Sequence, residues 1–206
     1  LLCSAEGAPV HIFGSSLQTA AMCDLHPDLS PGDAFLHNDP YTGGTHLNDV
    51  LMLHPVFFEG KLALFSAMRC HWNDVGGMTP GSLSGRVNEI IQEGIRIEPT
   101  KICDRGVMNE PFMNLLFNNM RSRSERLGDF NAMVGTGRKA EEHLMRLHER
   151  FGDGLLEGVE ELIIRSERQL RSRIEERPDG EYYAEGYIES DGTNPDPLVV
   201  KLKLTV

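Results

Sequence analysis

The sequence lacks three features: clustered positive charge, long apolar runs and closely spaced cysteines. Its 20 Lys and Arg are outnumbered by 31 Asp and Glu, which gives a formal net charge of -11. Because non-specific binding to nucleic acid or to an anionic membrane needs basic clusters, this charge balance argues against both partners. The densest basic stretch, Arg165 to Arg177, alternates with Glu and is typical of a solvated helix face.

The apolar runs span only a few residues, far fewer than the roughly 20 that a membrane-spanning helix needs. No CxxC pair occurs among the cysteines, which are Cys3, Cys23, Cys70 and Cys103. We therefore expect reduced thiols and a cytoplasmic protein. The chain also has no G-x-x-x-x-G-K-[ST] motif and no complete G-x-S-x-G motif, so a P-loop of its own and a nucleophile elbow are not expected.

At 206 residues the chain is long enough to bury a sizeable core. Residues 1–104 are rich in Gly, Pro, His and short apolar runs, which favours strands and functional loops. Residues 105–180 are helical in character, and residues 181–206 favour a strand pair. The sequence thus predicts a mixed α/β fold of the α+β type. The chain opens without Met and ends in a strand-like run, and we expect both ends to be cuts through a longer protein.

Individual elements follow from local signals. We expect a short strand at Pro9 to Phe13 and a short helix at Gln18 to Met22. Gly135 and Gly137 are expected to weaken or break the second of the later helices. Those helices are expected to begin at capping residues, namely Asn109, Ser122 or Ser124, and Asp153.

The central prediction is a β-hairpin. The apolar runs Val50 to Phe58 and Lys61 to Met68 are separated by Glu59-Gly60, a typical hairpin turn. Antiparallel strands lie roughly 4.8 Å apart, so the start of the first strand and the end of the second become neighbours. Four potential metal ligands stand at those two positions: His46, Asp49, His71 and Asp74.

The register decides which of these side chains share a face. A strict two-residue turn pairs Asp49 with Cys70 and places His71 on the opposite face. A three-residue loop or one bulge pairs Asp49 with His71 instead. Pro55 cannot donate to a strand ladder, which favours an edge position or a bulge.

Two neutral imidazoles and a carboxylate suit Zn, Mn, Fe or related divalent ions, with positions left for water or substrate. Asp39 and Asp74 are candidates for orienting the ligating imidazoles. The alternative is that these are hydrogen-bonded histidines and turn-forming aspartates, but their clustering around one hairpin favours a site. We expect His11 and His54 to be structural.

Glycine pairs flank the candidate ligands. Gly43-Gly44 and Gly76-Gly77 are expected where the backbone closely approaches a ligand. The loop from Thr79 to Gly85 adds amides and hydroxyls that suit an oxyanion, although a flexible loop explains it equally well.

Several segments of the chain resemble the hydantoinase B family. The similarity is strongest over residues 38–50 (NDPYTGGTHLNDV) and 71–82 (HWNDVGGMTPGS), and residues 89–97 and 125–129 extend it. The family includes the B subunits of ATP-dependent N-methylhydantoinase, the matching half of 5-oxoprolinase, and subunits of acetone and acetophenone carboxylases. These subunits are much longer than this chain, which would match their N-terminal portion.

The resemblance implies a manganese ion held by His46, Asp49 and His71, with proton transfer by Asp39 or Asp74. It also implies a hetero-oligomer with an A-type subunit that binds and hydrolyses ATP. The activated small-molecule intermediate would then undergo opening of a cyclic amide or carboxylation of a ketone. Two alternatives are a non-catalytic scaffold subunit of the same complex and a stand-alone metal-binding module.

Overall fold

The computed structural model describes residues 9–190 and 194–206. It confirms the predicted mixed α/β fold, and the chain divides between Gly152 and Asp153 into two compact units. Within the described ranges, no helix is long and apolar enough to cross a membrane. Three of the cysteines are free thiols, namely Cys23, Cys70 and Cys103, whereas Cys3 lies outside the described residues.

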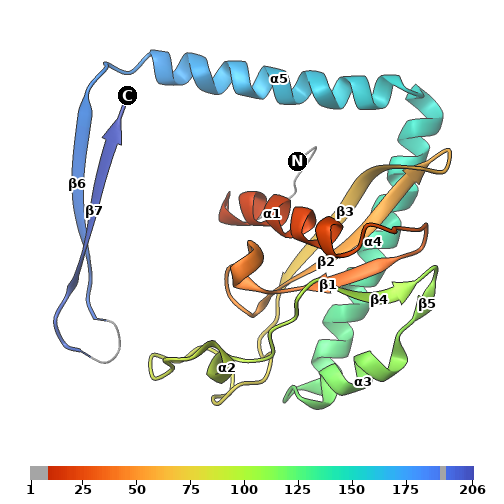
Figure 1. Ribbon diagram of the computed structural model, residues 1–206, viewed down its shortest axis with the longest axis horizontal. Coiled ribbons are helices and arrows are strands. Elements are labelled where there is room, and N and C mark those ends of the chain that lie inside the picture. The colour runs from red at the N-terminus through yellow and green to blue at the C-terminus, as the bar shows by residue number, and fades with distance from the viewer. Residues whose placement is uncertain (1–8, 191–193) are drawn as a thin grey trace. The chain divides into compact units, whose positions relative to one another are not determined.

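The first unit is built on an antiparallel sheet of five strands in the order β3-β2-β1-β4-β5 (Figure 1). The strand bounds are β1 Ala34–His37, β2 Asp49–Phe58, β3 Lys61–His71, β4 Thr100–Asp104 and β5 Val107–Met108. The 3-10 turn η1 (Pro40–Thr42) follows β1, and a short helix α2 (Ile90–Glu93) precedes β4.

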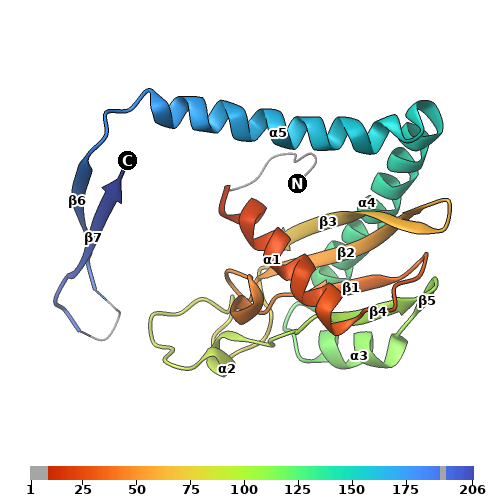
Figure 2. The ribbon, with the colours of Figure 1, turned by 45° about the horizontal axis from the view of Figure 1, so that its top comes forward.

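Side chains alternate between the two faces of this sheet. One face, here called the α1 face, carries a small buried apolar cluster of Met22, Phe35, Leu51 and Leu53. The opposite face, here called the α4 face, carries the large core, which includes Val50, Met52, Trp72, Phe117 and Phe130. Figure 2 shows α1 in front of the sheet and α4 behind it.

The helix α1 (Pro9–Leu25) covers the α1 face. The prediction of a strand at Pro9 to Phe13 is therefore wrong, and the predicted short helix is the second half of a longer one. The apolar run was too short to separate strand from helix by periodicity. Pro9 at the first helical position lacks only an N–H that would have no partner inside the helix.

The helices α3 (Glu110–Asn118) and α4 (Arg123–Phe151) supply the α4 face, and α4 packs on both β2 and β3. The Asn109 side chain accepts a hydrogen bond from the Phe112 amide at 3.2 Å, which confirms the predicted cap. The expectation that glycines break the second helix is wrong. A Cβ at position 137 would lie 2.3 Å from the His54 ring, so Gly137 lets α4 pack directly on that ring.

The second unit comprises α5 (Gly154–Glu175) and the antiparallel pair β6 (Glu181–Ile188) and β7 (Leu198–Thr205). The predicted helix start after Asp153 and the predicted strand pair are both confirmed. All residues of both strands are exposed.

Candidate metal site

The hairpin forms as predicted, and its register brings the predicted ligands together. Glu59 and Gly60 have φ values of 51° and 78°, the left-handed conformation of both central residues in a two-residue hairpin turn. A register shift between Val56 and Phe57 then pairs Asp49 with His71. The condition set by the sequence, a bulge between the turn and the site, is therefore met.

Pro55 lies beside this bulge. It pairs with Phe65 of β3 on one side, but β1 reaches only as far as Leu53 on the other. The strand is thus locally an edge at Pro55, where the missing N–H breaks no ladder bond.

Asp49 and His71 make the closest contact of the candidate site. His71 Nδ1 lies 2.7 Å from Asp49 Oδ1. The Asp49 side chain is 3% exposed, whereas that of His71 is 48% exposed. Asp49 Oδ2 also accepts hydrogen bonds from the Thr45 hydroxyl and, at 3.2 Å, from the His46 amide. The carboxylate is held from inside the protein, and the imidazole faces outward.

Burial of Asp49 by itself would raise the pKa of this carboxyl. The hydrogen bonds from Thr45, His71 and the His46 amide outweigh that effect, so its pKa lies below the usual value. Because an ionised carboxylate only accepts hydrogen bonds, the proton lies on His71 Nδ1. The lone pair of His71 Nε2 is then left for a metal ion or a proton.

His46 stands in the loop between η1 and β2 and is exposed. Its ring lies edge-on to that of His71, with centroids 6.0 Å apart and planes at 86°. Asp49, His46 and His71 thus lie around one end of the hairpin. Nevertheless, within residues 9–190 and 194–206 no three His, Cys, Asp or Glu side chains already form a closed metal-binding group.

The donor set nonetheless fits a divalent ion. It offers the Nε2 nitrogen of His71, which the buried carboxylate of Asp49 leaves free, and a second exposed imidazole, that of His46. Histidines that ligate metals commonly donate their other N–H to a carboxylate, which is the arrangement of His71 and Asp49. That His46, Asp49 and His71 share one ion stays a prediction.

Asp39 caps η1. Its Oδ1 accepts a hydrogen bond from the Tyr41 amide at 3.1 Å, and its side chain is buried. Its backbone carbonyl accepts from the Gly44 amide at 3.0 Å. Asp39 therefore shapes the loop that leads to His46.

Asp74 anchors the loop after β3. Its carboxylate accepts 2.9 Å hydrogen bonds from the Gly76 and Gly81 amides and pairs with Arg121 at 3.0 Å. Burial would raise the pKa of Asp74, but these hydrogen bonds lower it below the usual value. The Gly81 amide, one of the loop groups that suit an oxyanion, therefore donates to Asp74.

The flanking glycines are approached by the protein's own backbone. A Cβ at Gly77 would lie 2.6 Å from the Gln92 carbonyl oxygen, and one at Gly44 would lie 2.6 Å from the Asp39 oxygen. Gly76 and Gly77 also have positive φ values of 90° and 84°. Chain packing is thus sufficient reason for glycine at these positions.

Sequence reasoning missed a second polar group on the same face. Arg69 lies two residues before His71 on β3 and is paired with Leu51. Its Nη1 lies 3.3 Å from His11 Nδ1, and its Nη2 contacts Ser15 Oγ at 3.3 Å and Gln18 Oε1. The signal was the spacing of His11, Ser15 and Gln18, which places three polar side chains on one side of a helix.

Two other histidines are buried. Burial lowers the pKa of His37, whose Nε2 lies 2.7 Å from Thr42 Oγ1, to about 4. Burial likewise lowers the pKa of His54, against Gly137, to about 4. Both rings are therefore neutral at physiological pH, and His54 has the structural position expected for it.

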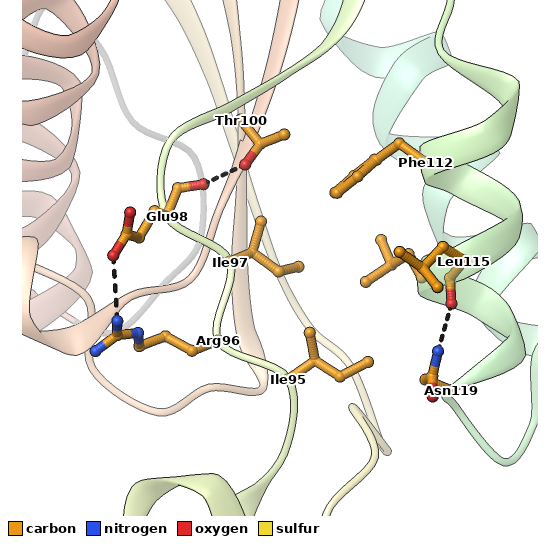
Figure 3. A pocket seen from close by; sticks show the side chains of 9 residues that line it. Ile95, Arg96, Ile97, Glu98, Thr100, Phe112, Leu115 and Asn119 are labelled. Atoms are coloured by element: carbon orange, nitrogen blue, oxygen red, sulfur yellow. Dashed lines mark hydrogen bonds and ion pairs between the residues drawn. The ribbon is translucent and has the colours of Figure 1, made fainter.

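A pocket of about 400 Å³ lies away from these residues, between α3 and the segment that precedes β4 (Figure 3). Its walls are mainly apolar and include Ile95, Ile97 and Phe112. No candidate metal ligand lines it.

Comparison with known proteins identifies the family. The family model described as hydantoinase B/oxoprolinase matches residues 1–206. The chain is 33% identical to caprolactamase subunit beta of Pseudomonas jessenii over 210 residues, which covers all of this chain and 36% of that protein.

Two solved structures share the fold. The crystal structure of the ATP-dependent caprolactamase from Pseudomonas jessenii matches 87% of this chain and 31% of its own, with a TM-score of 0.84 and 33% identity. A nucleotide-free structure of acetone carboxylase matches 98% of this chain and 29% of its own, with a TM-score of 0.85 and 17% identity. The second likeness shows the fold alone.

The chain thus spans about a third of the length of these relatives. The family match nevertheless covers residues 1–206, which include both the Asp49–His71 hairpin and the C-terminal strand pair. The chain belongs to the hydantoinase B/oxoprolinase family.

Proposed function

We propose that this chain carries the metal site of a B-type catalytic subunit that opens a cyclic amide after ATP-dependent activation. Cyclic amide hydrolysis is preferred over ketone carboxylation because identity is 33% with the caprolactamase subunit and 17% with acetone carboxylase. The single observation that carries the proposal is the Asp49–His71 pair, a buried carboxylate that leaves one nitrogen of an exposed imidazole free.

His46 and His71 would ligate the ion, for which manganese is proposed, with zinc or iron as alternatives, while Asp49, predicted as a third ligand, would support His71 from behind through the Nδ1 proton. Such an ion acts as a Lewis acid on a carbonyl oxygen or lowers the pKa of a bound water. The protein residues supply the orientation. Asp49 fixes the tautomer and ring direction of His71, while Thr45 and the His46 amide hold the carboxylate in place.

The ATP-binding step is assigned to an A-type partner subunit in a hetero-oligomer. Two names support this assignment. The related caprolactamase protein is named a subunit beta, and the solved structure of that enzyme is described as an ATP-dependent caprolactamase. The absence of a P-loop motif from this sequence agrees with that division. Proton transfer by Asp39 or Asp74 stays a prediction for the same complex.

The test is turnover by the full-length subunit together with its A-type partner. Caprolactam, hydantoins and 5-oxoproline are assayed with and without ATP, and ketones with and without bicarbonate. We expect ATP-dependent opening of one cyclic amide, lost in His71→Ala and retained in His143→Ala, which changes an exposed histidine of α4. Unchanged turnover in His71→Ala would support a scaffold role instead, and turnover without partner or nucleotide would support a stand-alone module.

A further inference from the structure

We propose that His11 is a substrate-contacting residue, whose Nε2–H donates a hydrogen bond to a substrate oxygen beside the Asp49–His71 pair, and that Arg69 is its positioning residue. This inference rests on the proposed function. It adds a residue from a different element, α1, to the site at the end of the hairpin.

Arg69 links α1 to the candidate metal site. It stands on the same sheet face as Asp49 and His71, because the pairs Asp49–His71 and Leu51–Arg69 are two residues apart on both strands. Burial lowers the pKa of Arg69, while the nearby Asp49 carboxylate raises it. The guanidinium therefore lies within electrostatic reach of the carboxylate that holds His71.

The helix α1 is fixed against this region by close packing. A Cβ at Gly14 would lie 2.6 Å from the Gly43 carbonyl oxygen and 3.6 Å from both terminal nitrogens of Arg69. Ser15 Oγ donates to the His11 carbonyl at 2.7 Å and accepts from Arg69 Nη2 at 3.3 Å. Gln18 is fully buried and accepts from the same nitrogen. One turn of α1 is thereby held over the loop that leads to His46.

The contact between Arg69 and His11 sets the tautomer of the imidazole. A guanidinium has only donors, so its 3.3 Å contact with His11 Nδ1 requires that nitrogen to be the acceptor. The ring proton of neutral His11 then lies on Nε2. Within the described part of the chain, no group pairs with His11 Nε2, and the residue is only half-buried, so this donor is available to a ligand.

The two histidines consequently have opposite tautomers. His71 keeps its proton on Nδ1, toward Asp49, and offers a lone pair, whereas His11 keeps its proton on Nε2 and offers a donor. Opening of an amide places negative charge on the carbonyl oxygen, and a donor that is already oriented stabilises that charge. A neutral imidazole held by Arg69 meets this requirement without a change of protonation.

The tautomer is tested by nitrogen NMR of the full-length subunit labelled with 15N-histidine. In the wild type we expect His11 to show a protonated Nε2 and an unprotonated Nδ1. Arg69→Met should remove this preference, so that both tautomers are seen. A protonated Nδ1 in the wild type would overturn the proposal, whether or not the variant folds.

The contact with substrate is tested by a matched pair of variants in the assembled complex. His11→Gln keeps an amide donor near the position of Nε2, whereas His11→Asn keeps a polar group only near Nδ1. We expect His11→Asn to lower kcat at least tenfold with little change in KM, and His11→Gln to stay within a few-fold of the wild type. Equal losses in both variants, or no loss in His11→Asn, would overturn the proposal.

Failure of the proposed function and failure of the role of His11 can be told apart. If the wild-type complex opens no cyclic amide, the proposed function fails. The role of His11 is then tested by following its Nε2 resonance while caprolactam is added. A shift of the Nε2 resonance at saturating caprolactam supports contact, and an unmoved resonance overturns it. If the wild-type complex is active but His11→Asn is unimpaired, only the inference fails.

Discussion

The two faces of the five-stranded sheet are built by alternate residues of the same strands, yet they differ in chemistry. The α4 face buries Val50 and Met52 in the large apolar core. The α1 face receives the alternate residues of β2, which include Asp49 and Leu51. Since a strand alternates its side chains with a period of two, one hairpin contributes to a core and to a polar site at once.

The difference lies in how each face is closed. The α4 face is covered by α3 and α4, and large apolar side chains fill the space between: the ring of Phe117, from α3, lies 6.1 Å from that of Trp72, which follows β3. Among the described residues, the α1 face carries a small apolar cluster and a set of polar contacts between Arg69 and α1. Stability therefore depends mainly on one face, and the proposed chemistry on the other.

The sharpest test of this comparison uses two consecutive residues. Trp72→Ala empties a fully buried site on the α4 face and should lower the free energy of unfolding by about 3–5 kcal/mol. His71→Ala removes a half-exposed ring and should lower it by only about 1 kcal/mol while abolishing turnover. Urea denaturation and turnover of the full-length subunit measure both quantities. Equal losses of stability in the two variants would contradict the division between the faces.

The next effect concerns the contact between α4 and β2. Gly137→Ala places a methyl group against the His54 ring and should destabilise the protein by about 1–3 kcal/mol through overpacking. Gly135→Ala lies in the same helix with open space around its Cβ and should stabilise it by roughly 0.5–1 kcal/mol. Thermal unfolding of both variants gives the comparison, and destabilisation of equal size at the two positions would contradict it.

A third effect is a pH dependence of stability that comes from the α4 face. Its His54 has a folded-state pKa of about 4, below the ordinary value of 6.5, so the unfolded chain binds more protons between these values. His54 alone should therefore lower stability by on the order of 2–3 kcal/mol as the pH drops from 6.5 to 4, and His37, whose pKa is also about 4, adds a contribution of its own. His54→Gln should flatten this part of the curve, whereas His143→Gln on the exposed side of α4 should not. Urea denaturation at a series of pH values measures the free energy of unfolding of each variant, and curves of equal slope for wild type and His54→Gln would contradict the prediction.

The hairpin and the meeting of Asp49 with His71 could be predicted because they depend on local signals. The Glu59-Gly60 turn and the flanking apolar runs predict the two strands, but the sequence left the register open between a strict two-residue turn and a three-residue loop or bulge. The helix starts after Asn109 and Asp153 were likewise local, and of the two only Asn109 caps its helix with a side-chain hydrogen bond.

The features that the sequence did not predict depend on tertiary contacts. Pro9 to Phe13 is too short a run to show a helical period, so α1 was missed, and with it the contact of His11 with Arg69. The role of Gly137 depends on a histidine 83 positions earlier in the chain, which no local pattern reveals. Asp74 is another case, because its ion pair with Arg121 joins distant segments.

The most direct measurement of the central claim is the metal content of the purified full-length subunit, determined by elemental analysis for the wild type and single-residue variants. The account predicts close to one divalent ion per wild-type subunit, retained in His143→Ala and lost in His46→Ala, Asp49→Ala and His71→Ala. Wild-type protein that binds no divalent ion when supplied with manganese, zinc or iron, or a full metal content in all three of these variants, would contradict it.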